Sequence, residues 1–258
     1  MSLFTTWIDL KTEKNGNKIL HSCTEKVGGR VKITDDLKKV MRSHYNDLAI
    51  IASDIQDLGY DLASKILKER LPQGKRARSG DLGEILATEF IEANLNYEIP
   101  IRRLRYKDGR EMALRGDDFI GIKFDQTSGL KLLKGESKSA KNLSNATIKS
   151  ARAALNRDNG RCTPHALLFI ADRLMEKGDP YDKLGRLLKK EVGTKSLKAE
   201  SIAHAFFTLS GNSPLTDLRE DLKTSDAARS QNTVNIQIAD HQDFIAELYK
   251  ELYELGNS

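Results

Sequence analysis

Residues 116–120 read Gly-Asp-Asp-Phe-Ile, and residues 135–138 read Gly-Glu-Ser-Lys. Seventeen residues lie between Asp118 and Glu136, which is about the length of two adjacent strands joined by a turn. Because strand side chains alternate between the two faces of a sheet, Glu136 and Lys138 point the same way. If the two strands pair, Asp118 lies beside Glu136 on that face. Two carboxylates and one ammonium would then converge near the edge of the sheet.

This trio has the chemistry of a divalent-cation site. Carboxylate oxygens suit Mg²⁺, with Mn²⁺ as the alternative, and both ions keep coordination positions for water and a substrate phosphate. Such an ion lowers the pKa of a bound water and neutralises charge on a phosphodiester. Lys138 would orient or help to deprotonate the attacking water, or stabilise the transition state electrostatically. The pattern therefore predicts Asp118, Glu136 and Lys138 as catalytic residues, with Asp118 and Glu136 also as metal ligands.

Glu84 is the candidate for a third acid. It lies in the segment 81–84, Asp-Leu-Gly-Glu, which opens an expected helix just before the strands. Gly83 would let this helix approach the sheet closely, and Asp81, almost one turn away, is a further side chain that can point inward. We therefore expect Glu84 to join the two strand acids as a metal ligand.

The segments around these motifs alternate between helical and strand periodicity. From Ser79 to Leu174 the apolar spacing predicts the order α-β-β-β-α-β. The expected elements are a helix at 79–94, capped by Ser79, strands at 97–106, 112–124 and 130–140, a turn at Asp125–Gly129, a helix at 144–156 and a strand at 165–174. Helices and strands that alternate within one segment predict the α/β fold class.

The flanking segments are expected to be mainly helical. Residues 1–33 read as short strands and turns, and residues 220–232 as a polar loop or short helix. The expected helices are one capped by Thr34 or Asp35 that runs to about Leu58, then Asp61–Arg70, Tyr181–Glu191, Ala199–Leu209 and Asp243–Leu255. The chain would divide into an N-terminal addition at 1–74, a core at 75–175 and a C-terminal helical region at 176–258 packed on the core.

The composition fits a folded enzyme. The chain has 258 residues, of which 39% are hydrophobic and 31% charged, enough for a real core and unlike a disordered protein. The net charge of +5 weakly indicates an anionic partner. Cys23 and Cys162 lie far apart and give neither a metal-ligand spacing nor a disulfide framework. We expect a cytoplasmic protein without a membrane segment, because the chain has no signal-peptide pattern and no long apolar run.

Basic residues flank the motifs in three runs, at 75–78, 102–105 and 149–161. The last run includes Arg152, Arg157 and Arg161. Neutralisation of phosphates by these runs would give a salt-dependent, sequence-neutral affinity for DNA. Ordinary solvated surface charge is the alternative for each run. There is no P-loop, so an ATPase role is not expected.

In their order, helix Glu, strand Asp and strand Glu-x-Lys, these residues resemble the PD-(D/E)XK nuclease superfamily. The resemblance covers about residues 75–175 and implies a mixed sheet with flanking helices. It also implies metal binding by Asp118 and Glu136, a catalytic role for Lys138, and a metal ligand at Glu84, as in members that add an acid from the first core helix. Asp117 stands where the nominal motif has Pro, which leaves open which Asp is the ligand. The form Gly-x-Asp before an apolar run favours Asp118.

The chain also resembles a narrower group, the HamA family of effector nucleases from the bacterial Hachiman anti-phage system. The shared segments are Ser-Gly-Asp-Leu-Gly-Glu at 79–84, Arg-Gly-Asp-Asp-Phe at 115–119, Gly-Glu-Ser-Lys-Ser at 135–139 and a helical tail. Membership would imply a helicase partner, HamB, that forms a heterodimer with the nuclease and holds it in check. It would further imply that damaged or unusual DNA releases cleavage of phage and host DNA.

The sequence therefore favours a Mg²⁺-dependent nuclease that hydrolyses DNA phosphodiesters under the control of a helicase. One alternative is a stand-alone restriction-type or junction-resolving endonuclease on the same fold. Another is a non-catalytic DNA-binding adaptor that retains a relic site. Replacing Glu136 and Lys138 with Ala distinguishes an adaptor from a nuclease of either kind, because an adaptor keeps its activity and a nuclease loses cleavage.

Overall fold

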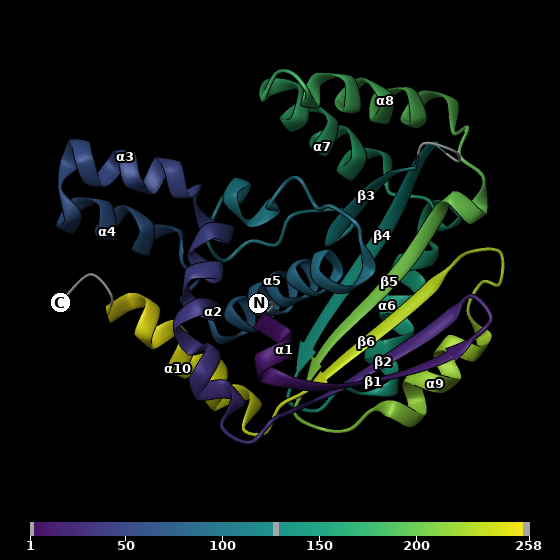
Figure 1. Ribbon diagram of the computed structural model, residues 1–258, viewed down its shortest axis with the longest axis horizontal. Coiled ribbons are helices and arrows are strands. Elements are labelled where there is room, and N and C mark those ends of the chain that lie inside the picture. The colour runs from purple at the N-terminus through teal and green to yellow at the C-terminus, as the bar shows by residue number, and fades with distance from the viewer. Residues whose placement is uncertain (1–2, 126–128, 255–258) are drawn as a thin grey trace.

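The computed structural model describes residues 3–125 and 129–254. Within these residues, six strands form one sheet in the order β1-β2-β6-β5-β4-β3, with helices on both faces (Figure 1). The strands are β1 (Ile8–Asn15), β2 (Lys18–Glu25), β3 (Phe119–Asp125), β4 (Gly129–Ala140), β5 (Ile202–Ser210) and β6 (Gln231–Gln237). The two outer pairs are antiparallel and the three inner pairs are parallel. The predicted α/β fold with a mixed sheet flanked by helices is confirmed.

The helices follow the sequence prediction in part. They are α1 (Leu3–Trp7), α2 (Gly29–Tyr45), α3 (Leu48–Leu58), α4 (Tyr60–Arg70), α5 (Lys75–Leu95), α6 (Asn145–Asn156), α7 (Pro164–Glu176), α8 (Tyr181–Thr194), α9 (Leu215–Thr224) and α10 (His241–Glu254), with 3-10 turns η1 (Arg103–Tyr106), η2 (Arg157–Gly160) and η3 (Ala199–Ser201). Four predicted helices are confirmed as α4, α6, α8 and α10, and Leu255 lies outside the described residues. Most of the predicted Asp125–Gly129 turn, residues 126–128, also lies outside them.

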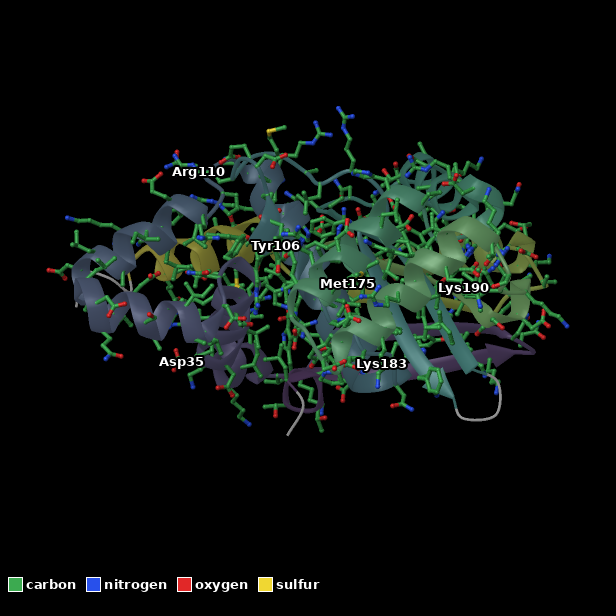
Figure 2. The ribbon with its side chains drawn as sticks, turned by 90° about the horizontal axis from the view of Figure 1, so that it is seen from above. Asp35, Tyr106, Arg110, Met175, Lys183 and Lys190 are labelled. Atoms are coloured by element: carbon green, nitrogen blue, oxygen red, sulfur yellow. The ribbon has the colours of Figure 1, made fainter. Side chains whose placement is uncertain are left out.

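Each face of the sheet carries its own hydrophobic core. Helices α1, α2, α5 and α10 pack on one face, against side chains such as Phe207 and Val234. The other face is covered by α6 and α9 around Phe206, and by α7 and α8 around Leu132 and Ile202. Seen from above, Met175 and Lys190 mark the α7–α8 pair, well apart from the α3–α4 hairpin (Figure 2). None of the described helices is long and apolar enough to cross a membrane.

The predicted helix at Ala199–Leu209 is wrong, because most of this segment is the strand β5. Every residue of β5 is buried. A central parallel strand is covered on both faces, so it reads as a continuous apolar run without the alternation that distinguishes strands from helices. The C-terminal region therefore contributes two strands, β5 and β6, to the sheet and is not purely helical.

The predicted strand at His165–Leu174 is also wrong, because this segment lies within helix α7. Its buried residues, Ala166, Leu167, Ile170, Ala171 and Leu174, recur at helical spacing. Pro164 occupies the first turn, where its missing N–H costs nothing. A short apolar run does not by itself separate a buried strand from a helix. The strand that follows α6 in the chain is therefore β5, with α7 and α8 inserted before it.

The first strand predicted for the core, at 97–106, is largely absent. The segment makes a single β-bridge between Glu98 and Ile122 and then forms the 3-10 turn η1. Pro100 cannot donate a backbone hydrogen bond to a neighbouring strand. The predicted second strand at 112–124 forms only from Phe119 onward, as β3.

Two helix boundaries also differ from the prediction. The helix expected from Thr34 or Asp35 to Leu58 is two helices, because Asn46 is extended and Asp47 caps α3 by accepting the N–H of Ala49. Helix α5 begins at Lys75, so Ser79 lies inside the helix and does not cap it.

The expected N-terminal strands exist, and they join the same sheet as the motif strands. β1 and β2 form a hairpin, and β2 pairs with β6 near the end of the chain. Strands from all three predicted regions, 1–74, 75–175 and 176–258, thus share one sheet. The division of the chain into these regions stays a prediction.

Candidate active site

The motif residues meet where β3 separates from β4. The two strands pair from Asp125 opposite Gly129 to Phe119 opposite Gly135, and the Asp118 N–H adds one more hydrogen bond to Gly135 O, at 3.1 Å. Beyond that point β4 continues to Ala140 with β5 on its other side. The β4 edge that bears Glu136 to Lys138 is therefore free of β3.

Asp118 lies directly against this edge. Its Oδ2 accepts the backbone N–H of Ser137 at 2.7 Å. Burial raises the pKa of the Asp118 carboxyl, and the ammonium of Lys138 acts in the opposite direction. The carboxylate is thus placed in a partly buried site with a cation as its neighbour.

Glu136 and Lys138 point to the same face of β4, as the alternation predicts. Lys138 Nζ lies 2.5 Å from Glu136 Oε1. Glu136 is 7% exposed. Burial, and then the charge of Asp118, raise the pKa of Glu136 to about 7, although Lys138 opposes this. The strand acids and Lys138 are therefore brought together.

Glu84 approaches from α5, the helix on the opposite face of the sheet. Burial, followed by the charges of Asp118 and Asp81, holds the pKa of Glu84 well above its ordinary value. Asp118 is the charge that raises the pKa of both Glu84 and Glu136. Glu84 and Glu136 are thus each repelled by Asp118, and nearby cations compensate this repulsion only in part.

The donor chemistry of this cluster fits a hard divalent cation, because carboxylate oxygens under mutual repulsion gain most from added positive charge. The side chains do not form a ready-made cage. Within residues 3–125 and 129–254, no three His, Cys, Asp or Glu side chains are arranged as a metal-ligand set. Glu136 faces Lys138 instead, and Asp118 faces the Ser137 amide. The metal-ligand roles of Glu84, Asp118 and Glu136 stay predictions.

The two aspartates of the pair have different surroundings. Asp117 is 2% exposed; its Oδ2 accepts the Thr163 N–H at 2.7 Å, and its Oδ1 lies 3.5 Å from the Nζ of buried Lys134. It therefore anchors the loop before β3 to the start of α7. Asp118, by contrast, faces the acids and Lys138, so its environment favours it as the functional member of the pair.

Asp81 also has a structural environment. Both of its carboxylate oxygens lie 2.9 Å from Lys107 Nζ, and Oδ2 accepts the hydroxyl of Tyr45 at 2.9 Å. Asp81 and Lys107 are both buried, so the pair links α5 to the loop after η1. Asp81, which the sequence suggested could point inward, therefore holds α5 against its neighbours.

Three motif glycines allow the close approaches that form the site. A Cβ on Gly135 would overlap three carbons of the Phe119 ring. A Cβ on Gly83 would lie 2.9 Å from Ser137 Oγ, and one on Gly116, which has φ +98°, would lie 2.9 Å from the Ala166 Cβ. Each motif therefore carries glycine where α5, β3 or α7 contacts its neighbour most closely.

Two residues near the site had no structural role assigned from the sequence, where Arg103 appeared only within the basic run 102–105. Arg103 is 7% exposed, and its guanidinium donates to the carbonyls of Asp117 and Arg115, which fixes the loop before β3. Lys134 is 1% exposed and lies on β4 two residues before Glu136. The only signal for Lys134 was its position on the same strand face as Glu136 and Lys138.

Four arginines of the basic runs are paired with carboxylates inside the protein. Arg102 and Arg105 form ion pairs with Glu92 and Asp47. Arg152 and Arg161 pair with Asp221 and Glu191 in the same way. The runs suggested that these arginines bind phosphate. In the structure, carboxylates of the same chain occupy these four side chains instead. Arg157 differs, as described below.

The fold and the site define the class of this protein: it is an α/β protein with acids and a lysine gathered at the free edge of a β-strand. The chain belongs to the HamA family, whose model matches residues 1–252, and the family predicted from the motifs is thereby confirmed. It is similar to the Hachiman protein HamA of Bacillus cereus, with 31% identity over 117 residues. The similarity covers 45% of this chain and only 40% of that relative.

Proposed function

We propose that the chain is a metal-dependent deoxyribonuclease of the PD-(D/E)XK type, the effector of a bacterial anti-phage defence complex. The observation that carries this proposal is the gathering of Asp118, Glu136 and Lys138 at the β4 edge, with the charge of Asp118 also acting on Glu84. Family membership and the Hachiman relative support the defence role.

The residues divide the chemistry among themselves. When bound, Mg²⁺ would supply charge neutralisation and activation of water at the phosphodiester. Glu84, Asp118 and Glu136 would hold it through oxygen atoms. Lys138 would place its ammonium beside the attacked phosphate, where it orients or deprotonates the water or stabilises the developing negative charge.

A HamB-type helicase is the proposed partner that controls this activity. The α3–α4 hairpin supports a protein partner, because α3 has no buried residue and α4 has only Ala63. Leu48, Ile50 and Leu62 are each about half exposed, at 60%, 51% and 49%. Exposed apolar side chains gathered on one hairpin mark an interaction surface. We assign the hairpin to contact with the helicase.

A non-catalytic DNA-binding adaptor is the second candidate. It is favoured by the ion pair between Glu136 and Lys138 and by the absence of a ready three-residue ligand set in the described part of the chain. An adaptor would need neither a free Lys138 nor a metal.

Cleavage of plasmid and linear DNA tests the proposal. The chain is assayed alone and with the helicase plus ATP, in Mg²⁺, in Mn²⁺ and in a chelator. A nuclease cleaves in at least one metal condition and stops in chelator. Inertness in every condition, with DNA binding intact, would favour the adaptor.

A further inference from the structure

The turn after α6, residues 157–160, has an unusual backbone. Asp158 and Asn159 both adopt the left-handed conformation at φ 56° and ψ 37°, and Gly160 follows at φ 72°. Asp and Asn tolerate this region better than other residues, but consecutive examples still cost free energy. Such a turn persists only where its surroundings determine it.

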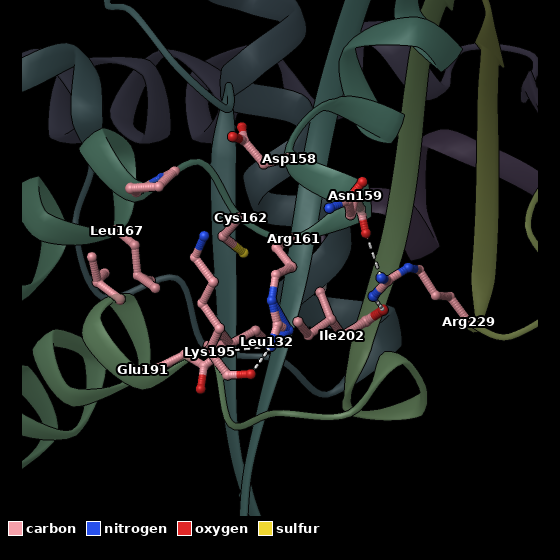
Figure 3. A pocket seen from close by; sticks show the side chains of 12 residues that line it. Leu132, Asp158, Asn159, Arg161, Cys162, Leu167, Glu191, Lys195, Ile202 and Arg229 are labelled. Atoms are coloured by element: carbon pink, nitrogen blue, oxygen red, sulfur yellow. Dashed lines mark hydrogen bonds and ion pairs between the residues drawn. The ribbon is translucent and has the colours of Figure 1, made fainter.

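Side chains from β4 and from the segment before β6 hold the carbonyls of this turn. Lys134 Nζ donates to Arg157 O at 2.9 Å. The guanidinium of Arg229 donates to Asn159 O at 2.6 Å, beside the cavity of about 400 Å³ that the turn borders (Figure 3). The turn is therefore fixed at its first and third residues.

The last residue of the turn is fixed as well. His204 Nε2 lies 2.8 Å from Gly160 O. Burial lowers the pKa of His204 to about 4, so its ring is neutral at pH 7 and donates through Nε2 to this carbonyl. A Cβ on Gly160 would lie 2.6 Å from Arg229 Nε, so the backbone passes close to the guanidinium. The turn thus rests on β5 and on the segment before β6.

Lys134 connects this turn to the acidic site. Its Nζ donates to Arg157 O and also lies 3.5 Å from Asp117 Oδ1. Asp117 directly precedes Asp118, and Lys134 shares a strand face with Glu136. One buried ammonium therefore sets the position of Arg157 relative to both strand acids.

Arg157 itself is exposed, and its charge acts on both strand acids. It partly opposes the rise in the pKa of Asp118 and of Glu136 that burial causes. Its Nε lies at the limit of a hydrogen bond to Ala154 O, at 3.5 Å. Among the described residues, its two terminal nitrogens meet no hydrogen-bond or ion-pair partner. Arg152 and Arg161, in the same basic run, are engaged by carboxylates.

We propose that Arg157 binds the phosphate that the acidic site attacks, or the phosphate next to it, and that Lys134 is its positioning residue. The inference rests on the proposed nuclease function. A phosphodiester is repelled by clustered carboxylates, so a guanidinium on a backbone anchored beside them attracts the strand before chemistry. The planar, forked donor set of arginine matches two phosphate oxygens.

Binding and cleavage are measured separately on the full chain with its helicase partner. Binding of a short DNA duplex is followed in chelator, where no cleavage occurs, across a range of salt concentrations. Arg157→Ala should weaken binding and lower the slope of log affinity against log salt by about one. It should also lower kcat/KM in Mg²⁺ about 10- to 100-fold, the scale of a lost charged hydrogen bond. Arg157→Lys should restore the salt slope and only part of the rate.

Arg186→Ala is the matched control, because this exposed arginine on α8 forms an ion pair with Asp182 on its own helix. It should leave the slope and the rate unchanged. Lys134→Met, which keeps the length of the side chain, tests positioning. It should lower kcat more than it raises KM. When it is added to Arg157→Ala, it should lower kcat/KM little further. If Lys134→Met fails to fold, Arg157→Lys and Arg157→Ala still decide the phosphate contact.

An unchanged salt slope and rate in Arg157→Ala would overturn the proposal, as would a wild-type complex that does not bind DNA. Additive losses in the double variant would overturn the positioning role of Lys134. Binding that depends on Arg157 without cleavage in any metal would retain the phosphate contact and overturn the nuclease. The two failures are therefore distinguishable.

Discussion

Asp118 accepts the Ser137 backbone N–H at 2.7 Å, which places its carboxylate at the edge of β4 where β3 ends. From this position its charge reaches Glu84 on α5 and Glu136 on β4. The site is therefore built around a strand edge and draws on elements from both faces of the sheet. Among the nearby groups, Lys138 does most to lower the raised pKa of the Asp118 carboxyl.

The contact of Phe119 with Gly135 predicts a strong packing effect. Gly135→Ala makes a methyl group overlap carbons of the Phe119 ring and forces β3 away from β4, so the free energy of unfolding should fall by about 1–3 kcal/mol or more. Gly193→Ala is the control, because a Cβ there meets nothing within 4 Å and helix propensity favours alanine. Thermal unfolding should show a lower Tm for the first variant only. Equal Tm values would mean that the ring does not constrain this strand.

The raised pKa of Glu136 predicts a pH-dependent stability in chelator. Between its ordinary pKa of 4.5 and its folded pKa of about 7, the folded protein binds a proton that the unfolded chain releases. The free energy of unfolding attributable to this group is thus greatest below pH 4.5 and falls as pH rises through 7, by at most about 3 kcal/mol. Glu136→Gln should flatten this dependence and be the more stable protein at pH 8. A variant that parallels wild type across pH 5–8 would contradict the raised pKa.

Replacement of Asp118 and replacement of Asp117 should have different effects on cleavage and on stability. Asp118→Asn should abolish cleavage and leave the Tm at pH 8 unchanged or raised, because it removes a repelled charge. Asp117→Asn breaks a fully buried pair with Lys134 and should lower the free energy of unfolding by about 3 kcal/mol. Unfolding curves and cleavage rates of both variants separate the roles. Full cleavage by Asp118→Asn would transfer the proposed ligand role to another residue.

The α3–α4 hairpin should be required for the helicase partner and not for the fold. Ile50→Asp and Leu62→Asp replace exposed side chains, so the Tm should change little while affinity for the purified helicase falls at least tenfold. Leu187→Asp, at a 42% exposed leucine on α8, is the matched control and should bind normally. Binding by all three variants at wild-type affinity would assign the helicase to another surface.

The motif strands were predictable because they obey local rules. Alternation correctly placed Glu136 and Lys138 on one face, and the hairpin spacing correctly paired β3 with β4. The glycine in Asp-Leu-Gly-Glu indicated a close approach to the sheet, and a Cβ on Gly83 would indeed lie 2.9 Å from Ser137 Oγ. These features depend on a few residues and on strand geometry.

The centre of the sheet was not predictable in the same way. β5 is buried on both faces and lacks alternation, while β6 reads as polar although six of its seven residues are buried. Its polar side chains are satisfied by distant partners, as when Asn235 Oδ1 accepts the hydroxyls of Thr208 and Ser210. Such pairings join segments far apart in the chain. Arg157 was visible only as part of a basic run, because its position depends on Lys134 and on a left-handed turn.

Anomalous diffraction from crystals grown with Mn²⁺ tests the central claim most directly. The account predicts one anomalous peak at the β4 edge, about 2.0–2.3 Å from oxygens of Asp118 and Glu136, with Lys138 released from its carboxylate partner. The same peak should be lost in Glu136→Gln. Crystals of a complex that cleaves DNA, with no peak at this edge or with the metal bound elsewhere, would contradict it.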